Sequence, residues 1–400
     1  MLGMEGVMQM SPQLERQEAE IMSENPLLEV RRLGQSVWLD DIRRGWLESG
    51  ELKRLIDEDG LAGVTSNPSI FHKAIGGSRD YDEAIRVLAA QGRSREEIYE
   101  ALTVEDVGRA ADLLRPTYDR WGGPRGFVSL EVNPHLAYET ERTMAEARRL
   151  WSKLARPNVF IKVPATLAGL PAIRQLIGEG INVNVTLLFG LPRYEEVVEA
   201  YLSGLEDRAG KGGSLRRVSS VASFFLSRID VLVDPLLEKM AKAGGDRTAL
   251  AEKLRGQAAL ASAKKAFAIY KKLFQGDRFR RLADRGATPQ WLLWASPGAK
   301  NPAYSDVKYV EPLIGPDTVN TMPMETLDAY RDHGRPKARL EEGLAEAEQV
   351  LAELAEAGID IDRVTRQLEK EGVQKFNEPF DLLMETLDRK REELLREPSA

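Results

Sequence analysis

The sequence contains no cysteine, which excludes a disulfide framework and any metal site built from thiolates. Histidine is also scarce: only His72, His135 and His333 are present, and their wide separation offers no metal-binding spacing. No apolar run is long enough to cross a bilayer. We therefore expect no metal site and no membrane-spanning segment.

A strong positive charge is missing as well. The formal net charge is −7 with both signs mixed along the chain, so no basic stretch is available to neutralise a phosphate backbone. The first residues lack the basic stretch and apolar core of a secretory signal. These features argue against a nucleic-acid partner and favour a cytoplasmic location. We expect residues 1–22 to be an appended segment, frayed or amphipathic, with Met22 as an alternative start.

The sequence does contain a regular alternation of short apolar runs with amphipathic helical stretches, the pattern of repeated β-strand and α-helix units. Apolar residues make up 42% of the chain and charged residues 30%, a balance typical of a globular fold. The runs are residues 36–40, 61–66, 127–131, 159–163, 181–187, 218–222, 291–295 and, more weakly, 317–320. This pattern predicts an α/β fold, a (β/α)8 barrel of the TIM type.

Extra helices are expected around the barrel. Two or three lie between the second and third runs, around residues 81–90 and 96–114. A basic amphipathic helix is predicted at residues 255–274. Residues 338–357, rich in Glu, Ala and Leu, begin a helical tail that we expect to pack across the barrel. Residues 23–400 are thus predicted to form one domain with carboxyl-terminal helices.

Polar side chains occur where the first five runs end. In a barrel the carboxyl ends of the strands carry the chemistry, so such residues are candidates for an active site. Residues 182, 184 and 186 share one face of their strand, and this polar face should point into the barrel. The candidates are Asp40, Asn67, Glu131, Lys162, Asn184 and Thr186.

Most of these residues also have a structural interpretation. Asn67 precedes Pro68 and can cap a helix that starts there, and Asp40 or Asp41 can cap the next helix. Glu131 can be a solvated loop carboxylate, and Thr186 suits a strand by its β-propensity alone. Taken singly, these residues do not identify a site.

Lys162 is harder to explain by structure alone, since it lies inside the apolar run Val159 to Val163. Its structural interpretation is an ion pair with Glu131 on a neighbouring strand. Its chemical interpretation is that desolvation favours the neutral amine, the form that attacks a carbonyl to give a Schiff base. With Asp40, Glu131 and Thr186 available to handle protons, the group predicts a class I aldol reaction.

A second group follows the sixth and seventh runs. Ser223 and Arg228 follow one run, and Ser296 and Lys300 follow the next. Hydroxyls and cations in late-strand loops of a barrel suit a phosphate monoester. A solvated surface remains the alternative for these short motifs.

Eight stretches of the chain resemble the transaldolase family. The resemblance spans most of the chain, from about residue 25 to residue 380. The stretches that carry it are SVWLDDI, GVTSNPSIF, SLEVNPHLA, NVFIKVPAT, GINVNVTLLF, VASFFLSRID, LWASPGAKNP and NTMPMETLDAY. The chain is most similar to the bacterial, stand-alone branch with a long helical tail. The resemblance implies a pentose phosphate pathway enzyme that transfers a dihydroxyacetone unit from sedoheptulose 7-phosphate to glyceraldehyde 3-phosphate, giving erythrose 4-phosphate and fructose 6-phosphate. It implies no cofactor, sugar-phosphate substrates and a homodimer.

The resemblance also implies roles for individual residues. Lys162 forms the Schiff base, Asp40 takes the hydroxyl proton when the carbon–carbon bond breaks, and Glu131 with Thr186 holds a proton-relaying water. Asn67 and Asn184 bind the dihydroxyacetone hydroxyls, Ser223 contacts substrate, and Arg228 and Ser296 bind phosphate. Strand parity favours Asp40 over Asp41, because Asp40 shares a face with Trp38.

One departure affects the phosphate site. Many relatives outside this branch have an arginine two residues after the second phosphate-site serine, whereas this chain has Gly298 and its nearest cation is Lys300. Arg228 is therefore the stronger phosphate candidate, and Lys300 the weaker one.

Three other functions remain open. A fructose 6-phosphate aldolase would use the same lysine but release free dihydroxyacetone, although that family looks shorter and lacks the tail. A pyridoxal-phosphate enzyme would also bury a lysine near a phosphate site, and it would be coloured. A sugar-phosphate sensor would bind without turnover, but has no evident need for a desolvated lysine beside proton-handling groups.

Overall fold

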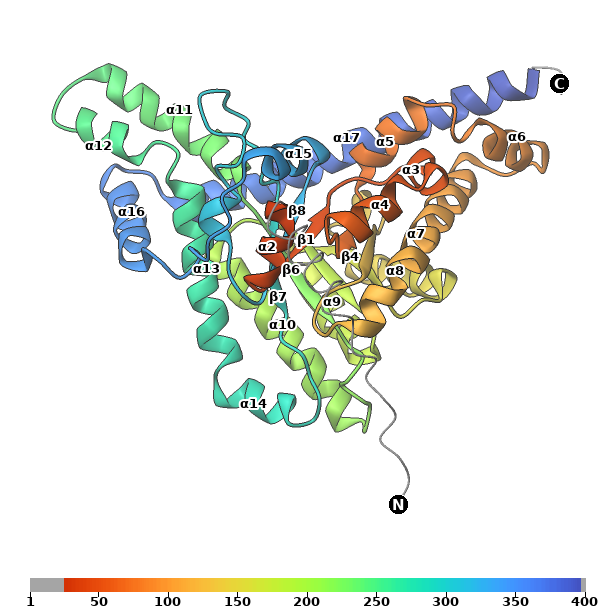
Figure 1. Ribbon diagram of the computed structural model, residues 1–400, viewed down its shortest axis with the longest axis horizontal. Coiled ribbons are helices and arrows are strands. Elements are labelled where there is room, and N and C mark those ends of the chain that lie inside the picture. Colours follow the sequence, from red (N-terminus) through yellow and green to blue (C-terminus); the bar gives the residue numbers. More distant parts are fainter. Residues whose placement is uncertain (1–24, 397–400) are drawn as a thin grey trace, which may run out of the picture.

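Eight parallel strands close into a barrel in chain order, with β1 beside β8 (Figure 1). The computed structural model describes residues 25–396, so the predicted appended segment, residues 1–22, lies outside the described residues. The strands are β1 (Gln35–Leu39), β2 (Gly63–Val64), β3 (Phe127–Glu131), β4 (Val159–Pro164), β5 (Val183–Leu188), β6 (Ser220–Phe225), β7 (Trp291–Ala295) and β8 (Thr318–Met322). The predicted (β/α)8 barrel is confirmed.

Helices surround the barrel and connect its strands. Before β4 they are α2 (Pro26–Arg32), α3 (Arg44–Ser49), α4 (Glu51–Glu58), α5 (Pro68–Gly76), α6 (Asp82–Ala90), α7 (Arg95–Arg120), the 3-10 turn η1 (Pro134–Leu136) and α8 (Thr140–Leu154). After β4 come α9 (Gly169–Glu179), α10 (Leu191–Gly210), α11 (Ser227–Ala243), α12 (Thr248–Leu254), α13 (Ala258–Phe274), α14 (Asp277–Ala283), η2 (Glu311–Leu313), α15 (Met324–His333), α16 (Leu344–Glu356) and α17 (Ile361–Arg396).

Several predicted boundaries were wrong, and glycine explains two of them. The helix predicted from residue 255 begins at Ala258, and the one predicted from residue 338 begins at Leu344. Just before these starts, Gly256 and Gly343 adopt left-handed φ angles of 68° and 69°, which interrupt a right-handed helix. The sixth strand also lies later than predicted, because the backbone of Phe225 still pairs with Ala295 of β7.

An aromatic stack fills the barrel below the strand ends. The ring centres of Phe127 and Phe160 are 4.3 Å apart, and Trp38 stacks on Phe160 at 6.1 Å. A Cβ atom at Gly63 would overlap the indole of Trp38, so the second strand must carry a glycine at this point. Phe160 precedes Lys162 by two residues on β4, so both side chains point into the barrel with the lysine above the ring.

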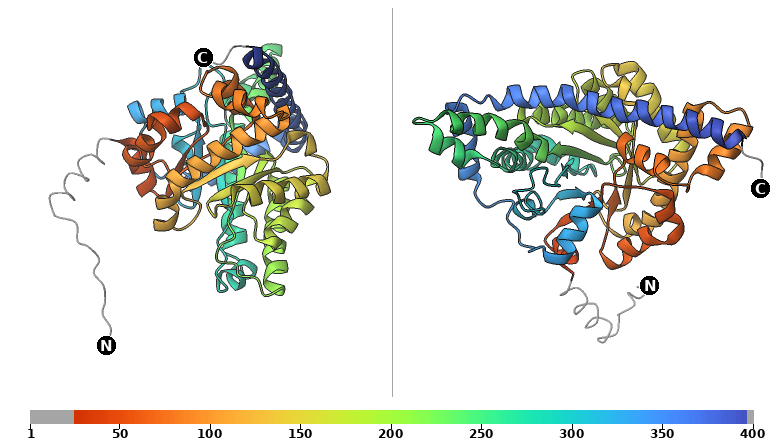
Figure 2. Two further views of the ribbon diagram at one scale, coloured as in Figure 1. Left: turned by 90° about the vertical axis from the view of Figure 1, so that its right-hand side faces the viewer. Right: turned by 90° about the horizontal axis from the view of Figure 1, so that it is seen from above.

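The last helix, α17, crosses the barrel (Figure 2). It contacts α5, α6, α7, α11 and β5, elements from both halves of the chain. Its buried face includes Phe376, Phe380, Leu383 and Leu387. The predicted packing of the tail across the barrel is therefore correct. Among the helices of residues 25–396, none has the length and apolar character that a membrane span requires.

Candidate active site

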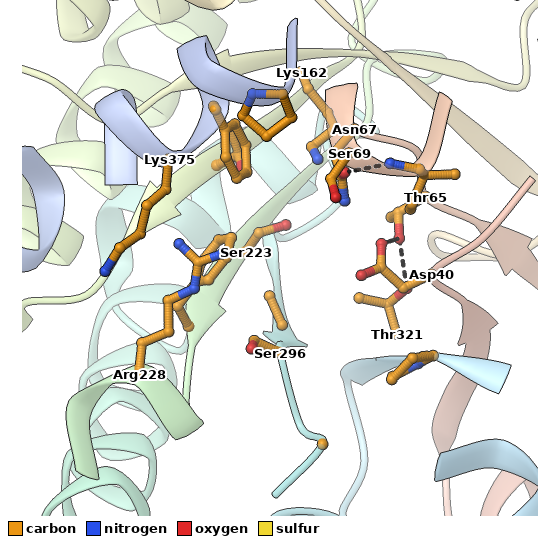
Figure 3. A pocket seen from close by; sticks show the side chains of 18 of the residues that line it. Asp40, Thr65, Asn67, Ser69, Lys162, Ser223, Arg228, Ser296, Thr321 and Lys375 are labelled. Atoms are coloured by element: carbon orange, nitrogen blue, oxygen red, sulfur yellow. Dashed lines mark hydrogen bonds between the residues drawn. The ribbon is translucent and has the colours of Figure 1, made fainter. Parts of the chain in front are cut away.

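A cavity of about 280 Å³ lies at the carboxyl ends of the strands, beneath α17 (Figure 3). Eight predicted site residues line it: Asp40, Asn67, Lys162, Thr186, Ser223, Arg228, Ser296 and Lys300. The other two, Glu131 and Asn184, are not among the described residues that form its wall, but each contacts one that is. The sequence-derived candidates therefore lie together at one end of the barrel.

Lys162 is held at the base of this cavity by two partners. Its Nζ donates a hydrogen bond of 2.9 Å to the carbonyl oxygen of Ser66 and lies 3.3 Å from Oε2 of Glu131. The residue is only 4% exposed. The structural interpretation, an ion pair with Glu131, is thus correct. It does not exclude a chemical role, because Lys162 also lines the cavity.

Glu131 is positioned by the pairing of β3 with β4, which sets it beside Lys162. It is 7% exposed, so its interpretation as a solvated loop carboxylate was wrong. Burial raises the pKa of Glu131 to about 7, although the charge of Lys162 opposes the rise. A carboxyl group with this pKa both gives and takes protons at neutral pH.

Asp40 lies beside Thr65 in the cavity wall, directly after β1 (Figure 3). Thr65 donates a hydrogen bond of 2.6 Å to Oδ1 of Asp40, and the hydroxyls of Thr65 and Thr321 are 2.7 Å apart. Burial raises the pKa of Asp40, and the charge of Lys162 opposes this. Asp40 does not cap the next helix, because α3 begins after Arg43 with no side-chain cap. A partly buried carboxylate supported by one hydroxyl suits a general base.

Asn184 and Ser223 form a hydrogen-bonded wall between Lys162 and the later strands. Oγ of Ser223 donates to Oδ1 of Asn184 at 2.6 Å, and Nδ2 of Asn184 donates to Oγ of Ser129 at 3.1 Å. Asn184 is fully buried behind Ser223, which itself lines the cavity. The amide therefore orients the serine hydroxyl that faces the cavity.

Thr186 lines the cavity with a buried hydroxyl that has no hydrogen-bond partner. The pairing of β5 with β6 shifts register between Val185 and Leu188, and Leu187 adopts a left-handed φ of 57°. Irregularities of this kind re-aim side chains next to active sites. An unpaired buried hydroxyl at such a position is available to a water or a substrate.

Asn67 caps a helix, as its structural interpretation predicts, and it also lines the cavity. Its Oδ1 accepts a hydrogen bond of 3.1 Å from the amide of Ile70 and so caps α5, whose first residue is Pro68. Asn67 also lines the cavity, close to Lys162 in the view of Figure 3. The capping bond fixes the side chain, and its amide nitrogen remains available for the cavity.

The wall formed by α11 and the segment after β7 is basic. The guanidinium of Arg228 lies 5.3 Å from the ring centre of Phe225 and 6.0 Å from that of Phe376, and its Nη1 is buried without a hydrogen-bond partner. Burial lowers the pKa of Arg228, as expected for a cation held without a close anion. This arrangement suits an anionic ligand group.

Ser296 is tied to the start of α11. Oγ of Ser227 donates a hydrogen bond of 2.8 Å to the carbonyl oxygen of Ser296, which adopts a left-handed φ of 53°. An L-residue in this conformation is strained, and such strain concentrates at binding sites. Lys300 lines the same wall. Arg228, Ser296 and Lys300 are therefore brought together as predicted.

Other residues of the cavity were missed from the sequence: Thr65, Ser69, Lys73, Thr321, Glu325, Lys375 and Phe376. Thr65 and Thr321 follow or end strands, so the rule that found Asp40 could have found them. Lys375 and Phe376 lie on α17, and no local signal marks them. Within residues 25–396 no group of metal-ligating side chains is arranged to hold a metal ion.

The chain is similar to known proteins over most of its length. Residues 37–387 match the family model described as transaldolase/fructose-6-phosphate aldolase. A transaldolase of Saccharopolyspora erythraea is 48% identical over 355 residues, which is 88% of this chain and 94% of that protein. A transaldolase of Trichodesmium erythraeum is 46% identical over 377 residues, 93% of this chain and 99% of the relative. A transaldolase of Thiobacillus denitrificans is 49% identical over 356 residues, which is 89% of this chain and 98% of that protein.

Proposed function

Because the chain belongs to the transaldolase/fructose-6-phosphate aldolase family, we propose that it is a transaldolase that transfers a dihydroxyacetone unit between sugar phosphates. The donor is sedoheptulose 7-phosphate, the acceptor is glyceraldehyde 3-phosphate, and the products are erythrose 4-phosphate and fructose 6-phosphate. The observation that carries the proposal is the buried amine of Lys162, which lines the cavity 3.3 Å from a carboxylate. A lysine supplies the covalent group itself, so the reaction needs no cofactor.

The first step is imine formation at Lys162. Its neutral amine adds to the C2 carbonyl of the donor, and the resulting carbinolamine loses its hydroxyl as water when a proton is supplied. Glu131 is the proposed proton donor, since it lies next to Nζ and has a pKa of about 7. The unpaired hydroxyl of Thr186 supports a role in holding the water.

The second step is cleavage of the carbon–carbon bond. Asp40 takes the proton of the C4 hydroxyl as the bond between C3 and C4 breaks, and the iminium nitrogen receives the bonding electrons to give an enamine. Erythrose 4-phosphate leaves, and the enamine then adds to the aldehyde carbon of the acceptor. Asn67 and Ser223 line the cavity and are proposed to bind the dihydroxyacetone hydroxyls, with Asn184 holding Ser223.

The phosphate of either substrate is proposed to bind at the basic wall. Arg228 supplies a guanidinium without a close anion, and the hydroxyl of Ser296 and the ammonium of Lys300 line the same wall. The distance from Lys162 to this wall then selects sugars with a terminal phosphate. A homodimeric state and a cytoplasmic location stay predictions.

Borohydride reduction tests the covalent step. Fructose 6-phosphate and borohydride are expected to add the reduced dihydroxyacetone unit to the peptide that contains Lys162, and Lys162→Met should abolish both the adduct and turnover. Lys73→Met is the matched control, because Lys73 lines the same cavity and should leave the adduct intact. An adduct that persists in Lys162→Met, or forms on another lysine, contradicts the proposal.

A second measurement separates transfer from aldol cleavage alone. Without an aldehyde acceptor, a transaldolase retains the dihydroxyacetone unit on the enzyme after one turnover, whereas an aldolase releases free dihydroxyacetone continuously. We expect near-stoichiometric retention. Continuous release would identify a fructose 6-phosphate aldolase instead, and binding with no trapped adduct would identify a sensor.

A further inference from the structure

A second cavity, of about 170 Å³, lies between α7 and α8 on the far side of Glu131. It is separate from the cavity that contains Lys162, and Glu131 forms part of its wall. The wall mixes polar and apolar side chains and consists of Glu96, Tyr99, Glu100, Thr103, Leu130, Glu131, Asn133, Glu146, Arg149, Leu150 and Phe380. The reaction steps proposed for Lys162 and Asp40 leave this space without a role.

The second cavity connects Glu131 with the surface. At its inner end, Glu131 is 7% exposed, and its Oε2 lies 3.3 Å from Nζ of Lys162. At its outer end, the side chains of Glu96 and Arg149 are 61% and 46% exposed. A space of this size has room for several water molecules, since each occupies about 30 Å³, and polar side chains such as Glu100, Asn133 and Glu146 offer them partners.

The first cavity offers a poor route for water during the reaction. Phe376 lies above Lys162 and is only 6% exposed, and a bound sugar phosphate would fill the remaining space. The proposed chemistry nevertheless releases one water when the imine forms and consumes one when the imine is hydrolysed. Glu131 is the described residue that both contacts Nζ of Lys162 and lines the second cavity.

We propose that the second cavity is a water passage through which Glu131 exchanges water and protons with solvent during formation and hydrolysis of the Schiff base. This inference rests on the proposed function. When the imine forms, the carbinolamine hydroxyl takes a proton from Glu131 and leaves as water, and the protonated imine and the Glu131 carboxylate remain. The carboxylate is then reprotonated through the passage. Before hydrolysis, Glu131 returns that proton to solvent through the passage. Its carboxylate then takes a proton from an entering water, whose hydroxyl adds to the imine carbon.

Exchange of the ketose oxygen reports on this passage directly. Each cycle of imine formation and hydrolysis replaces the C2 carbonyl oxygen of fructose 6-phosphate with solvent oxygen. The washout of an ¹⁸O label from C2, corrected for the rate with Lys162→Met, therefore measures how fast water reaches and leaves the imine. Binding of the sugar phosphate is measured separately from the KM for transfer.

Thr103→Leu blocks the passage from α7, because Thr103 lines it and is almost fully buried. We expect enzyme-catalysed washout to fall at least about tenfold, while the KM for fructose 6-phosphate and the final amount of borohydride-trapped adduct stay within about twofold. The matched control is Val104→Leu, the next residue of the same helix, which lines a different cavity. It should leave washout unchanged.

Leu150→Phe blocks the passage from the opposite wall, on α8. It replaces Thr103→Leu as the blocking variant if Thr103→Leu does not fold. The inference would be overturned if a folded blocking variant showed the same rate of ¹⁸O washout as Val104→Leu. It would also be overturned if washout, trapped adduct and substrate binding all fell equally. If the unaltered protein shows neither washout nor adduct, the proposed function fails instead.

Discussion

The ring centre of Phe376 lies 5.8 Å from Nζ of Lys162 and 6.0 Å from the guanidinium carbon of Arg228. The lysine belongs to β4, the arginine to α11, and the phenylalanine to α17, the last helix of the described chain. One ring of the tail therefore contacts both the proposed covalent residue and the proposed phosphate residue. The tail therefore lines the cavity, and we expect its crossing of the barrel to affect the proposed chemistry.

Truncation of this ring should admit water to the bound intermediate. In Phe376→Ala we expect free dihydroxyacetone to be released without an acceptor, at a rate at least about tenfold above that of the unaltered protein, because the enamine loses its cover. The variant should also lose about 3 kcal/mol of unfolding free energy, the usual cost of removing a buried phenylalanine side chain. Dihydroxyacetone is measured by an enzyme-coupled assay, and stability by urea unfolding.

Leu383→Ala is the control for this effect. Leu383 is fully buried on the same helix but does not line the cavity, so its removal should cost stability without raising dihydroxyacetone release. Equal release from the two variants would mean that loosening α17, and not uncovering Lys162, admits the water.

Arg228→Leu should weaken the binding of phosphorylated substrates specifically. Leucine retains packing against Phe225 and Phe376, whereas the charged hydrogen bonds to phosphate, about 1.5 to 3 kcal/mol, are lost. We expect the KM for fructose 6-phosphate to rise about 10- to 150-fold, with kcat/KM for unphosphorylated fructose within about threefold. A similar loss for both sugars would show that Arg228 supports the site as a whole.

A second cation of the cavity, Lys375, provides a comparison for the effect of Arg228→Leu on KM. Lys375 already pairs with Glu371 at 3.1 Å, so Lys375→Ala should raise the same KM by less than about fivefold. A larger effect of Lys375→Ala than of Arg228→Leu would assign the phosphate to α17 and contradict the assignment to α11.

Much of the site could be predicted from the sequence because it lies on strands. Alternation with period two fixes which side chains point into a barrel, and this rule alone places Asn184 and Thr186 correctly. Lys162 was identifiable for a different reason, since it is the charged residue of an otherwise apolar run. Both inferences use only local geometry.

The remainder depends on contacts between distant segments. Phe376 and Lys375 have the ordinary pattern of an amphipathic helix, and only the path of α17 across the barrel brings them to Lys162. The second cavity behind Glu131 is likewise set by how α7 packs on α8. The helix boundaries were missed at Gly256 and Gly343 because their left-handed conformations are not visible in a hydrophobic pattern.

The stability of the protein should depend on pH through Glu131. Burial raises its pKa from the ordinary 4.5 to about 7, with Lys162 lowering it and Asp40 raising it. The folded state therefore binds this proton more tightly than the unfolded state does. The resulting stabilisation is present below pH 4.5 and is lost as the pH rises through about 7. The loss corresponds to about 3 kcal/mol.

Glu131→Gln removes this dependence without removing the side chain. The difference in unfolding free energy between pH 4.5 and pH 8, measured with urea, should be about 3 kcal/mol smaller in the variant than in the unaltered protein. Comparing the two differences cancels the pH-independent cost of leaving Lys162 without its partner. An unchanged difference would mean that Glu131 does not titrate in this range.

Asp40→Asn should separate the two halves of the proposed reaction. Imine formation depends on Lys162 and Glu131 and should persist, so borohydride with fructose 6-phosphate should still give an adduct. Here the adduct should contain the whole sugar phosphate, because the bond between C3 and C4 is not broken. Transfer should fall by about 10² to 10⁴, the usual contribution of a general base. Mass spectrometry of the reduced peptide distinguishes the two adducts.

The matched control is the neighbouring carboxylate. Burial raises the pKa of Asp41 to about 6, yet Asp41 does not line the cavity. Asp40 does line it, and its Oδ1 accepts a hydrogen bond of 2.6 Å from the hydroxyl of Thr65. Asp41→Asn should therefore keep transfer within about threefold and give the adduct of the dihydroxyacetone unit alone. If Asp41→Asn accumulates the whole-sugar adduct and Asp40→Asn does not, Asp41 must be the base. The alternation of side chains along β1, which places Asp40 inside the barrel, would then fail to identify the carboxylate that takes the proton.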